Sequence, residues 1–522
     1  MFEGDIGGAL LSAAERHAER PALWAGGKHL TYAELFDQAA GIAGAIGAAG
    51  VPPGERVAIL SRRTPTAYAG ILGALLAGCT YIPLNTQFPR ERNQAMLRGS
   101  EARALVVDES SASKLDNFLD PLDLGLAVVR PEFGDDSLPD IGGRPAPLGR
   151  GEGAAFWRSV RRPVDPARLA YILFTSGTTG KPKGVPISHL NLSAYLDAIS
   201  RVGPLSPDDR ILQMAKLTFD LSVHDMFLSW LNGAEIFSMP DSAELLAPRL
   251  ITQHKLTGCL VVPSAATRML EQGLAKPNSM PSLRISYFCG EALPRSVAEA
   301  WKEAAPNSRI INIYGPTECT VVVCAYDYRV GKAPDLTTVP VGRLFGDQQL
   351  KLFTPEMAEA APGETGEICI AGSQVMDGYW RDPGLNAEKF VVVDGVRWFR
   401  SGDLGRWVEP HGLLFAGRTD RQVKIRGYRV ELQEIEGTVR RVTGRQQVAV
   451  IPWPVNAHGM ADGSVAFVCG DETEASAIRA GCRAIVADYM VPDRVVFVPE
   501  LPVNVNGKVD YRELAQHPSL SA

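Results

Sequence analysis

Several features that mark other classes of protein are missing from this sequence. Its longest apolar stretch, residues 39–51, is rich in alanine and glycine and far too short to cross a bilayer. Its first residues are acidic and lack the basic-then-apolar pattern of a secretory signal peptide. The formal net charge is −6 and no basic stripe stands out, which argues against a nucleic acid as the main partner. We therefore expect a soluble, cytoplasmic protein that partners neither a membrane nor a nucleic acid.

Cysteine pairs typical of zinc sites and disulfide frameworks are also absent. The eight cysteines are scattered along the chain without a Cys-x-x-Cys motif. The sequence therefore favours reduced thiols buried in a core. With 522 residues, of which 45% are hydrophobic, the chain is long enough for about two to four domains.

Most of the chain alternates strand-like and helix-like segments. Thr31 and Glu34 form a capping-box pattern that opens an alanine-rich helix, and another helix is predicted through residues 71–76. The predicted strands are residues 56–60, 79–84, 104–108 and 171–174. This alternation predicts mainly parallel α/β sheets.

The pattern changes near Asp420. Residues 422–431 alternate in character and residues 432–442 are helical. The next strand-like segments are residues 448–451 and 465–468. The sequence therefore predicts a small α+β unit at this end, and two domains, residues 1–419 and residues 420–522.

A glycine-rich loop carries the strongest chemical signal. Residues 174–184 read Phe-Thr-Ser-Gly-Thr-Thr-Gly-Lys-Pro-Lys-Gly, so glycines can turn backbone N–H groups inward while hydroxyls and lysines add donors and positive charge. It is not a Walker loop, because that motif needs four residues between its first glycine and its Gly-Lys pair, and Gly177 and Gly180 are separated by two. We expect a strand before the loop and a helix after it, near Ser188, a setting that favours a phosphate site over a flexible linker. The predicted polyphosphate ligands are Thr175, Ser176, Gly177, Thr178, Thr179, Gly180, Lys181 and Lys183.

Four further motifs follow this loop in a fixed order. They are Tyr-Gly-Pro-Thr-Glu at 314–318, Arg-Ser-Gly-Asp-Leu at 400–404, Gly-Arg-Thr-Asp-Arg-Gln-Val-Lys-Ile-Arg-Gly at 417–427 and Asn-Gly-Lys-Val-Asp at 506–510. Together with the loop they resemble the adenylate-forming superfamily of acyl-CoA synthetases, luciferases and adenylation domains of nonribosomal peptide synthetases. The resemblance implies a large N-terminal portion of parallel and mixed α/β sheets with a small barrel-like part. It also implies a small, mobile α+β C-terminal domain joined at a hinge, Asp420.

The resemblance also implies a chemistry. A carboxylate becomes an acyl donor when it is converted to an acyl-adenylate, with pyrophosphate leaving from ATP. Such catalysis depends on positioning and on neutralising phosphate charge. The implied cofactors are ATP and Mg²⁺, and the loop would hold the β- and γ-phosphates.

Other site residues have roles that the resemblance implies. Lys508 would neutralise charge between the substrate carboxylate and the α-phosphate, and Asp403 would accept hydrogen bonds from the ribose hydroxyls, with Arg418 nearby. The remaining implied roles are Mg²⁺ binding by Glu318, α-phosphate contact by Thr317 and adenine packing by Tyr314.

Asp220 points to the class of substrate. Members that activate amino acids place an aspartate there to pair with the substrate α-ammonium; the alternative is a helix cap ahead of Ser222. His224 lies four positions later, hence on the same helix face, and either lines the pocket or is satisfied structurally. By position, the predicted pocket wall is Asp220, Leu221, His224, Val261, Tyr287, Cys289, Gly290, Ile313, Val321 and Val322. Since Tyr287 and Ile313 are bulky, a substrate the size of alanine, glycine, serine or proline is favoured.

Closer matches resemble the D-alanine–carrier-protein ligase branch. They are Phe-Asp-Leu-Ser-Val at 219–223, Val-Pro-Ser at 262–264 and Phe-Cys-Gly-Glu-Ala-Leu-Pro at 288–294. The identities of His224, Tyr287 and Ile313 depart from that ligase, which leaves D-alanine itself in question.

These observations predict a stand-alone ligase that adenylates a small α-amino acid. It would then load the aminoacyl group onto the phosphopantetheine thiol of a separate carrier protein, because about a dozen residues follow Lys508 and no carrier domain fits there. An acyl-CoA synthetase that uses CoA as acceptor is the alternative enzyme. A non-enzymatic adenylate sensor or scaffold is the third possibility, against which Lys508, Glu318 and Asp403 argue.

Overall fold

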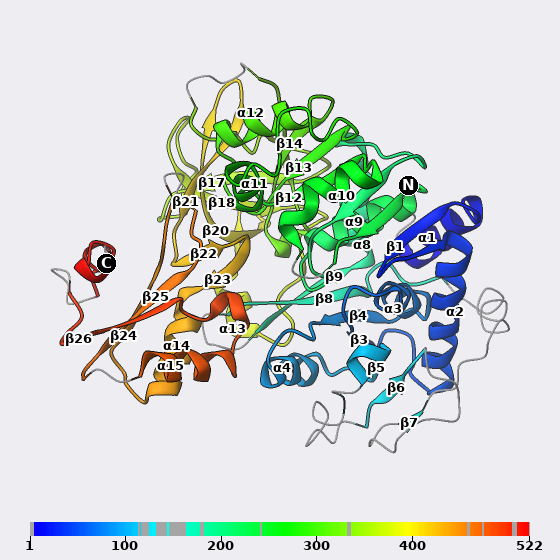
Figure 1. Cartoon of the computed structure of the whole chain (residues 1–522), viewed down its shortest axis with the longest axis horizontal. Helices are drawn as coiled ribbons and strands as arrows, with labels where there is room; N and C mark the ends of the chain where they lie inside the picture. Colours follow the sequence, from blue (N-terminus) through cyan, green and yellow to red (C-terminus); the bar gives the residue numbers. More distant parts are fainter. Residues whose placement is uncertain are drawn as a thin grey trace. The chain divides into compact units, whose positions relative to one another are not determined.

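The computed structural model of the chain describes most of its residues (Figure 1). They are residues 5–112, 115, 125–131, 144–145, 163–177, 182–240, 243–330, 336–456, 460–471, 474–503 and 509–520. They form two compact units, and each consists of three segments. Unit 1 contains Met1–Thr86, Leu97–Leu173 and Gly184–Thr419, and unit 2 contains Gln87–Met96, Phe174–Lys183 and Asp420–Ala522.

Unit 1 contains a seven-stranded sheet in the order β7-β6-β5-β3-β4-β8-β9, mostly of parallel neighbours. Its strands are β3 (Arg56–Leu60), β4 (Thr80–Leu84), β5 (Ala104–Val107), β6 (Ala127–Val129), β7 (Arg144–Pro145), β8 (Leu169–Thr175) and β9 (Lys183–Ser188). The helices of this part of unit 1 are α2 (Tyr32–Ala48), α3 (Pro65–Leu76) and α5 (Glu109–Ala112). The helix α4 (Arg90–Ser100) is divided between the two units after Met96. The capping box of Thr31 and Glu34 opens α2 as predicted. The predicted strands of this region are confirmed to within one or two residues at their ends.

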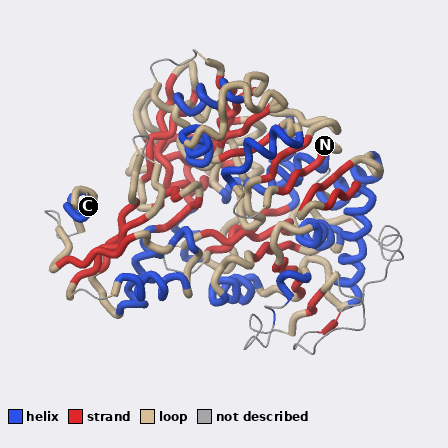
Figure 2. The backbone as a smooth tube through the Cα atoms, in the orientation of Figure 1, coloured by secondary structure: helices blue, strands red, loops and turns tan. Residues whose placement is uncertain are grey.

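Unit 1 also contains a nine-stranded sheet, in the order β16-β15-β14-β13-β12-β10-β11-β1-β2. Its strands are β1 (Pro21–Ala25), β2 (Lys28–Thr31), β10 (Arg210–Gln213), β11 (Glu235–Ser238), β12 (Gly258–Val261), β13 (Ile285–Phe288), β14 (Arg309–Tyr314), β15 (Cys324–Tyr328) and β16 (Arg343–Leu344). The helices that alternate with them are α1 (Ile6–Arg16), α8 (His189–Val202), α9 (Leu221–Leu231), α10 (Ala247–His254), α11 (Pro263–Glu271) and α12 (Arg295–Ala304) (Figure 2). The strands from β1 through β14 along this order are parallel, as the alternating pattern predicts.

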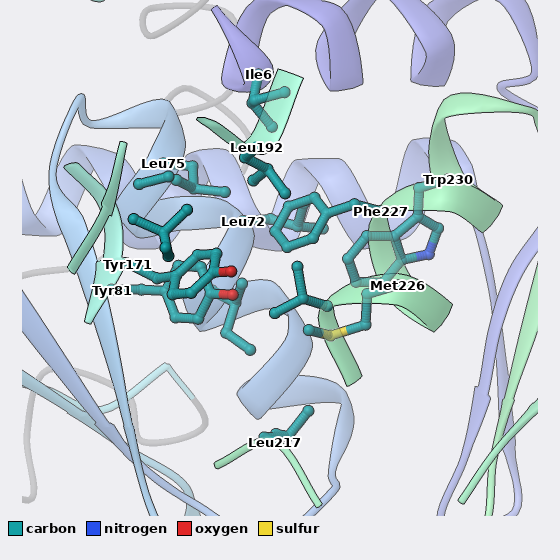
Figure 3. Close-up of a cluster of buried hydrophobic side chains, with 14 of the residues drawn as sticks. Ile6, Leu72, Leu75, Tyr81, Tyr171, Leu192, Leu217, Met226, Phe227 and Trp230 are labelled. Carbon is teal, nitrogen blue, oxygen red and sulfur yellow. The ribbon is translucent and has the colours of Figure 1, made fainter. Parts of the chain in front are cut away.

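Buried side chains fix the position of α9. Met226, Phe227 and Trp230 of this helix lie in a continuous apolar cluster with the paired rings of Tyr81 and Tyr171, whose centroids are 5.5 Å apart (Figure 3). All five side chains are fully buried. Packing on this scale leaves α9 little freedom, so the residues at its first turn are held in place.

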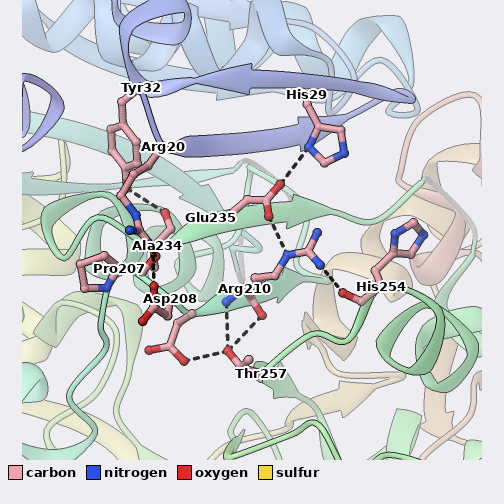
Figure 4. Close-up of polar contacts among 11 residues, drawn as sticks. Arg20, His29, Tyr32, Pro207, Asp208, Arg210, Ala234, Glu235, His254 and Thr257 are labelled. Carbon is pink, nitrogen blue, oxygen red and sulfur yellow. Dashed lines mark hydrogen bonds and ion pairs between the residues drawn. The ribbon is translucent and has the colours of Figure 1, made fainter. Parts of the chain in front are cut away.

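Polar contacts attach the N-terminal hairpin β1–β2 to the parallel strands. Glu235 accepts hydrogen bonds from Arg210 Nε at 2.7 Å and pairs with His29 Nδ1 at 3.1 Å (Figure 4). The Tyr32 hydroxyl donates to the Ala234 carbonyl at 2.7 Å. Since Glu235 is only 5% exposed, these two partners offset the cost of burying its charge.

A five-stranded antiparallel sheet completes unit 1 and provides the predicted barrel-like part, together with the short helix α13 (Pro383–Lys389). Its strands are β17 (Gln349–Phe353), β18 (Gly366–Ala371), β19 (Phe390–Val393), β20 (Val396–Val408) and β21 (Gly412–Arg418). Residues Asp403 and Arg418 are direct register partners across β20 and β21. The hairpin therefore places their side chains close together.

The C-terminal segment of unit 2 is a small α+β fold, as predicted. It contains the hairpin β22 (Gln422–Ile425) and β23 (Tyr428–Glu431), and a three-stranded sheet β24-β25-β26. The remaining elements are α14 (Leu432–Thr443), β24 (Val448–Pro452), β25 (Ser464–Cys469), α15 (Ala475–Arg483), β26 (Arg494–Val498) and α16 (Tyr511–Leu514). Arg426 and Gly427 both have positive φ, 52° and 81°, as a two-residue hairpin turn requires.

No helix among the described residues is both long and apolar enough to cross a membrane.

Candidate active site

The glycine-rich loop joins two strands rather than a strand and a helix. The loop leaves β8 and enters β9, and α8 begins only after that strand, with Ser188 as its N-terminal cap. The predicted strand–loop–helix setting is therefore wrong, because a strand stands between the loop and the helix. The physical reason is sheet pairing: β9 adds to the edge of the sheet beside β8 although it contains a glycine and a proline.

The described part of the loop contacts two carboxylates and a backbone carbonyl, and all three partners belong to unit 2. The Gly177 N–H donates to Oε2 of Glu434 at 3.2 Å, and Lys183 Nζ lies 3.7 Å from Oε1 of Glu431. The Ser176 hydroxyl donates to the Arg429 carbonyl at 2.9 Å. These contacts show that the loop presents donors and positive charge to anions. Four predicted ligands lie outside the described residues: Thr178, Thr179, Gly180 and Lys181.

Glu434 is held by a second partner as well. Arg92 Nη1 donates to Glu434 Oε1 at 2.7 Å, and the two side chains are only 5% and 1% exposed. The mutual attraction of the two side chains offsets part of the cost of burying them. The loop therefore faces an ion pair that belongs to its own compact unit.

Three of the predicted nucleotide-binding residues meet in unit 1. The Tyr314 hydroxyl donates to Oδ2 of Asp403 at 2.7 Å, and Arg418 binds the other oxygen, Oδ1. Burial, reinforced by the Asp403 carboxylate, raises the pKa of Tyr314 well above its ordinary value, so the hydroxyl remains a donor. Since each carboxylate oxygen has two lone pairs, Asp403 retains acceptor capacity for a ribose diol.

Glu318 lies in a tightly built loop after β14. It is fully buried, and its Oε1 accepts a hydrogen bond from the Tyr379 hydroxyl at 2.7 Å. Gln374 holds this loop from outside, because its amide donates to the carbonyls of Cys319 and Val322 at 3.3 Å and 2.9 Å. Thr317 precedes Glu318 in the same 3₁₀ turn, so the two residues are placed together as predicted.

The backbone of this loop is strained. Thr320 and Val321 both adopt a left-handed conformation, with φ of 55° and 70°, which is unfavourable for β-branched residues. A Cβ atom at Gly315 would lie 2.4 Å from the Cα of Val322, so only glycine allows the chain to close here. Strain of this kind is typical of binding and catalytic loops.

The carboxylate chemistry at Glu318 suits Mg²⁺. This ion prefers one or two protein carboxylates and takes its remaining oxygens from phosphates and water. Among the described residues no group of three or more His, Cys, Asp or Glu side chains could hold a metal by itself. A Mg²⁺ ion at Glu318 would therefore depend on the nucleotide for most of its ligands.

Asp220 occupies the N-cap position of α9. Its side chain makes no capping hydrogen bond, so the helix-cap alternative does not account for its carboxylate. Its carbonyl instead accepts the first helical N–H groups, from Val223 and His224. Asp220 therefore precedes the first turn of α9 and contributes its backbone carbonyl, not its carboxylate, to the start of that helix.

Several predicted wall residues gather around one buried hydroxyl, that of Tyr195. Burial, reinforced by the neighbouring Tyr287, Cys289 and Asp220, raises the pKa of Tyr195 well above its ordinary value. The same hydroxyl shares a hydrogen bond of 2.6 Å with His224 Nδ1. The structure thus brings four sequence-predicted pocket residues to one place.

The remaining predicted wall residues lie at the carboxyl ends of parallel strands. Val261 is the last residue of β12, Cys289 and Gly290 follow β13, and Ile313 is near the end of β14. Ligands of open α/β sheets bind at this edge. Leu221 begins α9, and Val321 and Val322 lie in the strained loop.

Comparisons with known proteins identify the family of the chain. The family model described as AMP-binding enzyme matches residues 10–380, and the model described as AMP-binding enzyme C-terminal domain matches residues 434–508.

The chain belongs to the AMP-binding enzyme family.

Relatives of this AMP-binding enzyme include large synthases and solved adenylation domains. The chain is 31% identical to a plipastatin synthase component of Bacillus subtilis over 95% of its own length, and 32% identical to phenyloxazoline synthase MbtB of Mycobacterium tuberculosis over 96%. It spans only 18% and 34% of the lengths of these two synthases. Among solved structures, it is 34% identical to the adenylation domain AlmE of Vibrio cholerae, with a TM-score of 0.89 and 98% of each chain covered. That structure contains glycyl-adenosine-5'-phosphate. The predicted superfamily and fold class are therefore confirmed.

Sequence reasoning missed three supporting residues of this AMP-binding enzyme. Tyr195, Gln374 and Tyr379 each hold a predicted site residue or its loop. Nothing in their local sequence distinguishes them from ordinary buried residues, because their partners are distant along the chain. Lys508, the predicted catalytic lysine, lies outside the described residues, and the hinge role of Asp420 stays a prediction.

Proposed function

We propose that this AMP-binding enzyme uses Mg·ATP to activate a small α-amino acid, with glycine the first candidate, as its aminoacyl-adenylate. It then transfers the aminoacyl group to the phosphopantetheine thiol of a separate carrier protein. The observation that carries the proposal is the position of Asp220. Its carboxylate does not cap α9. It lies close enough to Tyr195 to raise the pKa of that hydroxyl, as Tyr287 and Cys289 also do.

A carboxylate in a dry pocket is suited to an ammonium group. Burial of a charge is costly unless an opposite charge pairs with it, so an α-ammonium and Asp220 would stabilise each other. Burial lowers the pKa of His224 to about 3, so its ring is neutral at physiological pH. The neighbouring imidazole therefore does not compete with the substrate for the negative charge of Asp220.

Large rings restrict the space beyond Asp220. The rings of His224 and Tyr287 meet edge to face with centroids 4.7 Å apart, and both side chains are nearly fully buried. This arrangement favours a substrate with a very small side chain. The presence of glycyl-adenosine-5'-phosphate in the similar AlmE structure supports glycine as the first substrate to test.

The nucleotide would be held by residues already described. Asp403 would accept from the ribose, Glu318 would bind a Mg²⁺ ion shared with the phosphates, and the glycine-rich loop would bind the β- and γ-phosphates. The bound Mg²⁺ would neutralise phosphate charge. Lys508 is proposed to act on the developing charge at the α-phosphate.

ATP–pyrophosphate exchange over a panel of amino acids tests the proposal. Glycine and other small amino acids should support exchange, whereas phenylalanine and aryl acids should not. A second assay should compare a holo-carrier protein with CoA as acceptor of the activated group. Exchange supported best by aromatic or aryl acids would refute the substrate assignment, and CoA acting as well as any holo-carrier would favour an acyl-CoA synthetase.

A further inference from the structure

One helix, α8, holds two rings of the predicted pocket wall. Tyr195 lies within α8 and Gly203 is its C-terminal cap. The Tyr195 hydroxyl bonds to Nδ1 of His224 at 2.6 Å, and the Tyr287 hydroxyl donates to the Gly203 carbonyl at 3.1 Å. The two rings therefore have anchors about two helical turns apart on the same element.

The anchored rings also support each other. Their planes meet at 76° with centroids 4.7 Å apart, an edge-to-face geometry that is favourable for aromatic groups. The side chains of His224 and Tyr287 are only 2% and 3% exposed. Neither ring can turn aside without leaving a buried polar atom unpaired, which is unfavourable.

Gly203 is required for this arrangement. A Cβ atom built at this position would lie 1.8 Å from the Tyr287 hydroxyl and 2.8 Å from its Cζ atom. Any larger residue would force the ring away from the end of α8. The close approach of backbone and hydroxyl therefore depends on the missing side chain.

We propose that α8 acts as a clamp, in which Tyr195 and Gly203 are positioning residues that keep the side-chain end of the pocket closed to a β-carbon. This inference rests on the proposed function. It specifies the substrate as glycine, in preference to either enantiomer of alanine. Glycine needs no space beyond its α-carbon. The methyl group of alanine would require an anchored ring to retreat, and such overpacking is unfavourable in a well-packed site.

The ratio of kcat/KM for glycine to kcat/KM for alanine, measured by ATP–pyrophosphate exchange, tests the clamp. The wild-type enzyme should prefer glycine by roughly tenfold to a hundredfold, as expected for overpacking by one methyl group. Tyr195→Phe removes the bond to His224 and should reduce this ratio by about tenfold, mainly through a lower KM for alanine. Tyr287→Phe removes the bond to Gly203 and should reduce the ratio less, because the ring itself remains. Since both changes are nearly isosteric, each variant should fold.

Tyr32→Phe is the matched control. It also removes a buried tyrosine hydroxyl, bonded to the Ala234 carbonyl at 2.7 Å, and it should leave the ratio unchanged. An unchanged ratio in both Tyr195→Phe and Tyr287→Phe, or an equal fall in Tyr32→Phe, would overturn the clamp. So would a wild-type enzyme that activates alanine as well as glycine. A wild-type enzyme that exchanges with no amino acid would instead refute the proposed function itself.

Discussion

The amino-acid end of the site in unit 1 and the glycine-rich loop in unit 2 satisfy their polar groups in opposite ways. In unit 1, Tyr195, His224 and Tyr287 form neutral hydrogen bonds and ring contacts that no substrate has to replace. In unit 2, the loop donors at Gly177 and Lys183 face carboxylates. If the proposed ligands are right, the first region needs no rearrangement to receive an amino acid, whereas the donors of Gly177 and Lys183 would have to exchange carboxylate partners for phosphate.

This difference follows from the chemistry of the two ligands. A small amino acid is recognised by shape and by one charge, so a rigid, dry wall is sufficient. A triphosphate is recognised by many charge-assisted hydrogen bonds, which are strong enough to displace an internal carboxylate. We therefore expect rigidity to control selectivity in unit 1, and competition with internal carboxylates to control nucleotide affinity in unit 2.

The largest expected effect concerns the charge in the rigid region. Asp220→Ala would leave the substrate ammonium without its proposed partner, and removing one partner of an ion pair that the bound substrate buries costs roughly 3–5 kcal/mol. At about 1.4 kcal/mol per tenfold, kcat/KM for the amino acid should fall by roughly 10²–10³ or more. Steady-state ATP–pyrophosphate exchange measures this loss.

Asp225→Asn is the matched control for Asp220→Ala. Burial raises the pKa of Asp225 well above its ordinary value, which favours the neutral acid, and asparagine has nearly the same shape as that form. Exchange by this variant should stay within a few-fold of wild type. Equal losses in the two variants would show that position on α9, not the Asp220 charge, matters.

A smaller effect should appear in the acid stability of the same region. Burial lowers the pKa of His224 to about 3, below its ordinary value of 6.5. As the pH falls below about 6.5, the unfolded chain gains a proton that folded His224 cannot accept, so stability decreases by up to about 1.4 kcal/mol per pH unit. The contribution is fully present above the unfolded pKa and is lost progressively toward the folded pKa.

Denaturant unfolding at about pH 7 and about pH 5 measures this dependence. His224→Gln should make stability less sensitive to acid. If acid weakens the His224→Gln variant as steeply as the wild type, the imidazole is not held in a dry environment.

Local sequence patterns predicted some elements of both regions, but not the contacts that distinguish them. The capping-box pattern at Thr31 predicted a helix start directly, because its side chain bonds within one turn, and the helix start predicted near Ser188 is also confirmed. The strand β9 was missed because its glycine and proline disfavour a strand until neighbouring β8 supplies hydrogen bonds. The bond of Tyr195 to His224 spans 29 residues and depends on how α8 packs near α9, which no local pattern encodes.

The smallest expected effect concerns competition at the loop. Glu434→Gln keeps the shape of the side chain but removes the negative charge that faces Gly177 and pairs with Arg92. ATP phosphates would then compete with a weaker acceptor, and Arg92 would lose its counter-charge. We therefore expect the KM for ATP to fall by about threefold to tenfold, as a loss of roughly 1 kcal/mol of competing interaction implies.

Glu91→Gln separates this competition from a general loosening of unit 2. Glu91 pairs with Arg441 at 3.2 Å in the same compact unit, but both side chains are more than half exposed. An exposed pair contributes little, so the KM for ATP should not change in this variant. An unchanged or higher KM in Glu434→Gln, or an equal fall in Glu91→Gln, would mean that the internal carboxylate does not compete with phosphate. The loop would then be as ready for its ligand as the pocket, and the contrast between the two regions would be lost.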